Sequence, residues 1–151
     1  MQNESHVGSV PARLRDRPTW LISRTYARSH RILNEAFAES GTGLRSYHYR
    51  LLVALDEAGP SSQADLSRGT SVDRSDVVAV LSDLEQAGLI DRTVDPAHRR
   101  RNIVTLTRAG KKQLKVLDRV VDAAQEQVME PLAPSERARL LKLLRRLEDP
   151  A

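Results

Sequence analysis

Three consecutive arginines, Arg99, Arg100 and Arg101, stand in the segment VDPAHRRRNIVTLT, directly before an alternating apolar pattern. Their neighbouring guanidinium groups repel one another, so the cluster suits either a solvated loop or a surface that meets an anion. The stretch from Arg92 to Lys115 holds eight basic residues and one acid, Asp95. A local excess of this sign predicts a polyanionic partner, and nucleic acid is the first candidate.

Patterns for catalysis or metal binding are weak in this chain. Ser46 and His48 suggest a hydrolase, but residues two apart on a helix point to different faces, and no glycine-rich oxyanion loop precedes them. The histidines show no metal-ligand spacing; they are His6, His30, His48 and His98. We therefore expect no enzymatic activity, no cofactor and no bound metal.

The composition favours a single domain in the cytoplasm. Of 151 residues, 29% are charged and 40% are hydrophobic, the formal net charge is +4, and no change in composition divides the chain. The absence of cysteine fits a reducing compartment. No apolar run approaches the roughly 18 residues of a membrane span, and the amino-terminal residues lack the apolar core of a signal peptide. We expect no membrane partner and a cytoplasmic location.

Long helical patterns lie at both ends of the chain. Residues 1–16 are polar and aperiodic and predict a flexible tail. Residues 17–40 predict a helix, opened by Pro18 and stopped by glycines, with an apolar stripe at Ile22, Tyr26, His30, Leu33 and Phe37. A second long helix begins near Thr107 and is broken by Pro131, and an amphipathic helix from about Ser135 follows it.

Shorter elements fill the centre. SYHYRLLVALDEAG predicts an apolar helix, and SQADLSRG predicts a brief one that Ser61 or Ser62 can cap. VDRSDVVAVLSDLEQAG predicts the next helix, capped by Thr70 or Ser71 and ended by Gly88. LIDRTV and NIVTLT then alternate as strands joined by the turn DPAHRRR.

This order predicts a mainly α fold with a small β-wing, namely a winged helix-turn-helix domain flanked by long dimerisation helices. Residues 17–45 and 107–151 would supply the dimerisation helices, and residues 46–106 the DNA-binding region, in one compact domain. The long helices carry more apolar surface than a domain of this size can bury alone. Such stripes usually meet a second copy across a two-fold axis, so we expect a homodimer.

In such a fold, the helix over residues 72–88 would enter the major groove of double-stranded DNA. The face opposite Val77, Leu81 and Leu84 offers five candidates, which are Arg74, Ser75, Val78, Ala79 and Ser82. Arginine suits guanine, and the apolar side chains suit thymine methyl groups. An ion pair with Asp73 or Asp76 is the alternative for Arg74.

The predicted hairpin tip is narrow enough to enter the minor groove, where arginine suits the negative channel. Arg99 or Arg100 would insert, and Arg101 would turn to a phosphate or to an acid. At the helix N-termini, Ser62, Gln63 and Ser71 are candidates for phosphate contacts.

Several motifs follow one another between residues 73 and 110. Asp73-Arg74-Ser75 begins a helix, and Leu84-Glu85 leads through Gly88-Leu89-Ile90 to Arg92; then follow Asp95, Arg99, Arg100, Leu106-Thr107 and Gly110. This combination resembles the core of the MarR family of bacterial transcriptional regulators, and the similarity covers nearly everything after residue 17. The resemblance implies a dimeric winged-helix repressor that binds a pseudo-palindromic operator.

Members of this family often respond to phenols or aromatic carboxylates held between the dimer helices and the winged domain. The resemblance therefore implies a small aromatic or phenolic anion as effector, for which the candidate residues are Trp20, His30, Tyr47, His48 and Arg50. Ordinary packing in the core or at an interface is the alternative for these side chains.

Three residues depart from the family pattern. His98 stands where the family usually has an aspartate that braces a neighbouring arginine, so we expect the wing to be ordered only by DNA. Ala79 stands where many members have arginine, and Asp76 where many have threonine. Near phosphates this carboxylate would be unfavourable, unless it accepts from a cytosine amino group or pairs with Arg74.

The residues and the resemblance together favour a sequence-specific DNA-binding transcriptional regulator that responds to a ligand. The alternative is a winged helix used only as a protein-interaction module. Such modules usually lose the positive charge of the wing and recognition helix, whereas this chain keeps both.

Overall fold

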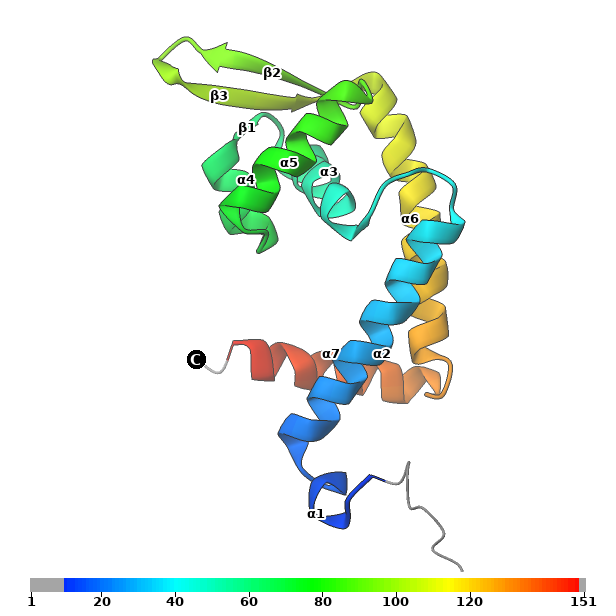
Figure 1. Cartoon of the computed structure of the whole chain (residues 1–151). Helices are drawn as coiled ribbons and strands as arrows, with labels where there is room; N and C mark the ends of the chain where they lie inside the picture. Colours follow the sequence, from blue (N-terminus) through cyan, green and yellow to red (C-terminus); the bar gives the residue numbers. More distant parts are fainter. Residues whose placement is uncertain (1–9, 150–151) are drawn as a thin grey trace, which may run out of the picture.

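A computed structural model describes residues 10–149, and its elements follow the predicted order with two additions (Figure 1). They are α1 (Ala12–Arg15), α2 (Pro18–Glu39), α3 (Ser46–Ala58), β1 (Ser61–Ser62), α4 (Gln63–Thr70), α5 (Arg74–Gln86), β2 (Ile90–Asp95), β3 (His98–Leu106), α6 (Arg108–Met129) and α7 (Pro134–Glu148). The additions are α1 and β1. The mainly α fold with a small wing is confirmed.

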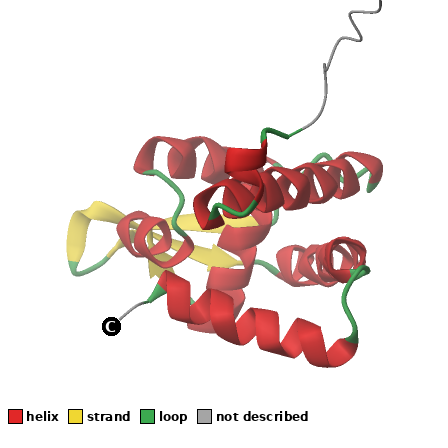
Figure 2. Cartoon of the chain, turned by 90° about the horizontal axis from the view of Figure 1, so that it is seen from below, coloured by secondary structure: helices red, strands yellow, loops and turns green. Residues whose placement is uncertain are grey.

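The long helix α6 connects the two ends of the molecule. Around its amino-terminal end lie α3, α4, α5 and the β2–β3 hairpin, while α2 packs along its distal part (Figure 1). The view from below shows strands only in the wing (Figure 2). The predicted boundaries between the DNA-binding region and the dimerisation helices, at residues 45/46 and 106/107, fall between elements.

The wing is a three-stranded antiparallel sheet in the order β1-β3-β2. Ser61 and Ser62 pair with Val104 and Ile103 at its root, and Asp95 pairs with His98 at its tip. The predicted turn over residues 95–101 is wrong, because the chain reverses tightly between Asp95 and His98 and the three arginines belong to β3. The Asp95 carboxylate stabilises this reversal by accepting from the Ala97 amide at 2.9 Å.

The core lies where α3, α4, α5 and α6 meet the root of the wing. In α5 the predicted stripe is confirmed, with Val77, Val80, Leu81 and Leu84 all buried. Further buried side chains come from the surrounding elements, including Leu51, Leu52, Leu55, Leu66, Ile90, Val104 and Leu117. Only one face of α5 is used in this packing, so this helix keeps an outer face.

Two local predictions need correction. Neither Thr70 nor Ser71 caps α5: Ser71 has a left-handed backbone (φ 54°) at the carboxyl end of α4, and Asp73 is the N-cap of α5. Within the predicted tail, Ala12–Arg15 form one helical turn, whereas residues 1–9 lie outside the described residues.

The stripe predicted for α2 is buried only near its carboxyl end. Phe37 is buried, but Ile22 and Tyr26 are 52% and 65% exposed in the single chain. On α7 the exposed apolar side chains include Leu141, Leu143, Leu144 and Leu147. One copy of the chain therefore leaves apolar surface uncovered on two of its helices.

The start of α6 is fixed against the end of α5. Thr107 caps α6 by accepting from the Gly110 amide at 3.0 Å, and its hydroxyl donates to the Gly88 carbonyl at 2.8 Å. The Thr107 amide also donates to the carbonyl of Leu89 at 3.1 Å. Gly110 lies so close that a Cβ there would be 2.1 Å from that carbonyl oxygen. A glycine is therefore required where these elements meet.

Candidate functional site

The outer face of α5 is the first candidate surface. Arg74, Ser75 and Val78 are exposed on it, whereas Ser82 is half-buried and donates from its hydroxyl to the Val78 carbonyl at 3.0 Å. Neither Asp73 nor Asp76 forms an ion pair with Arg74 among residues 10–149. The guanidinium group of Arg74 is thus available to a partner outside the chain.

The wing supplies the second set of cations. Arg99 and Arg100 are exposed, and neither has an ion pair within the described residues. Arg101 turns to an acid, one of its two predicted roles, and donates to the Asp65 carboxylate at 3.1 Å. The arginines therefore divide into two free cations and one that holds the wing to α4.

Asp65 gathers several donors around the start of α4. Its carboxylate accepts from the Ser62 hydroxyl at 2.7 Å and also pairs with Arg68. The hydrogen bond from Ser62, aided by the nearby guanidinium groups, lowers the pKa of the Asp65 carboxyl. No sequence motif indicates Asp65, yet it holds Arg101 in the way that the usual wing aspartate of the family would hold a neighbouring arginine.

A hollow of about 400 Å³ lies between α4 and β3, lined by Ser62, Gln63, Ala64, Arg68, Arg100, Arg101 and Asn102. Guanidinium groups and the amino-terminal end of α4 face this space, which suits it to an anion. Of the predicted phosphate contacts, Ser62 and Gln63 both line the hollow, although Ser62 is buried as the cap of α4 and accepts from the Asp65 amide at 3.2 Å. Ser71 is exposed in the turn before α5.

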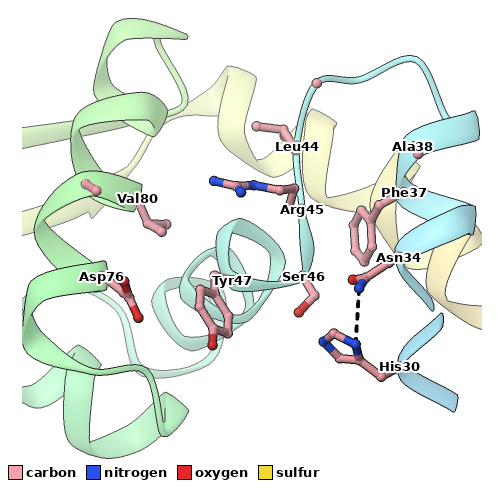
Figure 3. Close-up of a pocket in the computed structure, with 12 residues that line it drawn as sticks. His30, Asn34, Phe37, Ala38, Leu44, Arg45, Ser46, Tyr47, Asp76 and Val80 are labelled. Carbon is pink, nitrogen blue, oxygen red and sulfur yellow. Dashed lines mark hydrogen bonds between the residues drawn. The ribbon is translucent and has the colours of Figure 1, made fainter. Parts of the chain in front are cut away.

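A larger pocket of about 550 Å³ opens between α2, α3 and α5 (Figure 3). Its lining residues are His30, Asn34, Phe37, Ala38, Gly43, Leu44, Arg45, Ser46, Tyr47, Asp76, Ala79 and Val80. In the close-up, His30 and Asn34 approach from α2, Tyr47 from α3 and Asp76 from α5. The Asn34 amide donates to His30 Nδ1 at 3.2 Å. The pocket thus combines aromatic surface with charges of both signs.

The structure brings only two of the five predicted effector residues, His30 and Tyr47, into this pocket. Trp20 lines a separate hollow near the start of α2, and the Arg50 guanidinium lies 5.5 Å from the centre of the Tyr47 ring. Ala79, expected at the DNA, also lines the pocket.

His48 is 2% exposed and connects α3 to α5. Its Nδ1 accepts from the Arg45 amide at 3.0 Å, so Nε2 carries the proton and donates to the Asp83 carboxylate at 2.9 Å. Both ring nitrogens are engaged within the chain, which assigns His48 a structural part.

Within residues 10–149, none of the helices combines the length and apolarity needed to cross a membrane. The same range contains no cluster of three histidine, cysteine, aspartate or glutamate side chains arranged to hold a metal ion.

Comparison with known proteins identifies relatives of this chain. Residues 41–101 match a model described as the MarR family. The HTH-type transcriptional repressor NicR of Pseudomonas putida is 32% identical over 129 residues, which cover 85% of this chain and 80% of NicR.

Solved structures agree with that match. The structure of Bordetella bronchiseptica BpsR, whose DNA binding is regulated by 6-hydroxynicotinic acid, has 26% identity and a TM-score of 0.81, covering 93% of this chain and 99% of BpsR. PcaV of Streptomyces coelicolor, solved with its natural ligand, has 26% identity and a TM-score of 0.78, covering 93% and 98%.

Proposed function

This chain belongs to the MarR family of transcriptional regulators, and we propose that it binds an operator in double-stranded DNA as a homodimer. Each α5 enters a major groove, and each wing reaches the adjacent minor groove. An aromatic anion in the pocket between α2, α3 and α5 releases the DNA, so the protein acts as a ligand-responsive repressor in the cytoplasm.

The observation that carries this proposal is the division of α5 into two faces. One face packs the core with Val77, Leu81 and Leu84, while Arg74, Ser75 and Val78 remain exposed on the other. Arg74 begins the helix, and recognition helices contact bases with their first residues. An exposed face that begins with the guanidinium group of Arg74 and the hydroxyl of Ser75, on a helix whose other face is buried, suits base contacts better than protein packing.

The wing supports the same assignment through charge. Arg99 and Arg100 are free of ion pairs within residues 10–149, and Arg101 ties β3 to α4 through Asp65. Arg99 and Arg100 lie beyond this fixed root of the wing, and their free guanidinium groups suit the negative potential of a narrow minor groove. The hollow between α4 and β3 adds a site for a backbone phosphate.

The uncovered apolar residues of α2 and α7 support dimerisation, because a second copy would remove them from water. A two-fold protein imposes a pseudo-palindromic order on its half-sites. The effector proposal rests on the pocket, which contains His30 and Tyr47, and on the relatives solved with or regulated by small ligands.

The test is selection of bound genomic DNA, followed by titration of the selected site. Arg99→Ala and Arg100→Ala should each weaken binding by about 1–3 kcal/mol, and Arg74→Ala should relax the base preference at one position of each half-site. Arg31 is an exposed arginine on α2, outside the proposed DNA interface. Arg31→Ala removes the same charge and should bind DNA like the wild type.

Unchanged titrations for both wing variants, with the dimer intact, would rule out wing insertion. If no DNA is enriched at all, the chain is better explained as a protein-interaction module.

A further inference from the structure

Asp76 belongs to the recognition helix and yet lines the ligand pocket. The predicted partners of its carboxylate were a cytosine amino group and Arg74, but no ion pair with Arg74 exists among the described residues. In Figure 3 its carboxylate lies on the α5 side of the pocket, across from His30 and Asn34. The Asp76 side chain is exposed, and it forms no ion pair within the described residues.

We propose that Asp76 is a specificity-determining residue of the pocket. It selects aromatic acids that carry, away from their carboxylate, a hydrogen-bond donor such as a hydroxyl, amino or ring N–H group. This inference rests on the proposed function, since it assumes that the pocket holds an effector.

The other polar groups of the pocket supply the site for the ligand's own carboxylate. Because the Asn34 amide donates to Nδ1 of His30, the neutral imidazole carries its proton on Nε2, which has no hydrogen-bond partner among the described residues. Arg45, whose side chain extends toward α5 in Figure 3, adds a guanidinium group, which only donates and has no ion pair within the described part of the chain. These donors suit an anion.

Asp76 gives the pocket the opposite preference on its α5 side. An ionised carboxylate only accepts hydrogen bonds, so a ligand group placed against it must donate. A ligand with an ether or methyl group there would desolvate the carboxylate without replacing the lost hydrogen bonds. Since Asp76 stands two residues from Arg74, the ligand's donor group would contact the same helical turn that is proposed to contact DNA.

Asp76 also has a purely structural explanation. It is an acid in the first turn of α5, where a negative charge stabilises the helix N-terminus. A structural part would change the stability of the protein but not its preference among ligands. The experiment must therefore measure that preference.

The probes are 4-hydroxybenzoate and 4-aminobenzoate, each compared with 4-methoxybenzoate and 4-methylbenzoate, which lack the donor. Binding is measured by calorimetry on the DNA-free protein. The wild type should bind the donor-bearing acids more tightly, by about tenfold, as expected for a hydrogen bond to a charged group. Asp76→Leu should remove this difference, whereas Asp76→Asn, which keeps an acceptor oxygen, should retain part of it.

Asp56→Leu is the matched control, because Asp56 is an exposed acid on α3 outside the pocket, and its ligand preference should equal that of the wild type. Equal affinity for both kinds of acid in the wild type, an unchanged preference in Asp76→Leu, or no binding of any probe would each overturn the proposal. None of these results concerns DNA, so the titrations of the selected operator judge the proposed function separately.

Discussion

Replacing Gly110 by alanine should destabilise the protein at the contact between α5, the wing and α6. The new Cβ would lie 2.1 Å from the Leu89 carbonyl oxygen and 2.6 Å from Leu106 Cδ1. The Leu106 side chain can rotate away, but the carbonyl belongs to the backbone and accepts the Thr107 amide. Relief of the overlap therefore requires α6 to move away from Leu89.

The size of the effect follows from three contributions. Overpacking of a closed contact costs about 1–3 kcal/mol, and a weakened hydrogen bond to the Leu89 carbonyl costs about 1 kcal/mol more. Alanine regains about 1 kcal/mol through its higher helix propensity. Gly110→Ala should therefore lower the free energy of unfolding by about 1–3 kcal/mol, the sum of those ranges.

Gly69→Ala is the matched control, because Gly69 also lies in a helix but a Cβ there would meet no atom within 4 Å. It should leave stability unchanged or raise it by up to about 1 kcal/mol. The assay is urea unfolding followed by circular dichroism at one protomer concentration, since the stability of the proposed dimer would depend on concentration. If Gly110→Ala unfolds at the same urea concentration as the wild type, the close approach to Leu89 does not constrain this contact.

Two further outcomes are expected. His48→Ala removes both hydrogen bonds of a buried ring and should lower the free energy of unfolding by about 2–4 kcal/mol in the same urea assay. Arg50→Ala, at an exposed residue of the same helix, should change it by less than about 0.5 kcal/mol. Equal effects of the two variants would contradict the structural role of His48. Burial, together with the hydrogen bond to Asp118 and its charge, raises the pKa of Tyr49 to about 12. The stabilisation linked to this phenol is present below pH 10 and is lost between pH 10 and about 12; in Asp118→Ala its absorbance titration should move to lower pH, and an unmoved titration would refute the contact.

The limits of most elements could be predicted because they depend on residues with fixed backbone preferences. Pro18 is the first residue of α2, and Gly88 ends α5 with a positive φ of 72°. The buried stripe of α5 was equally accessible, since its period identifies the buried face. These features depend on residues that are close together in the sequence, so the sequence pattern predicts them.

Features that depend on distant partners could not be predicted. β1 is only two residues long and becomes a strand because it pairs with Ile103 and Val104. The ion pair of Arg101 depends on Asp65, a residue 36 positions earlier. Likewise, the position of Asp76 in a pocket follows from how α5 packs beside α2 and α3, which no spacing within α5 reveals.

The pairing of β1 divides the wing into two parts with different tolerance to sequence change. The pairing of β1 with β3 ends at Ile103, and from there to the tip the hairpin consists of β2 and β3 only. An isolated two-stranded hairpin is marginally stable in water, so the outer part carrying Arg99 and Arg100 contributes little to the stability of the fold. Residues there can be exchanged, inserted or deleted at small cost, while the root keeps its position. The wing tip is therefore a replaceable part, which could be redesigned without rebuilding the domain that holds it.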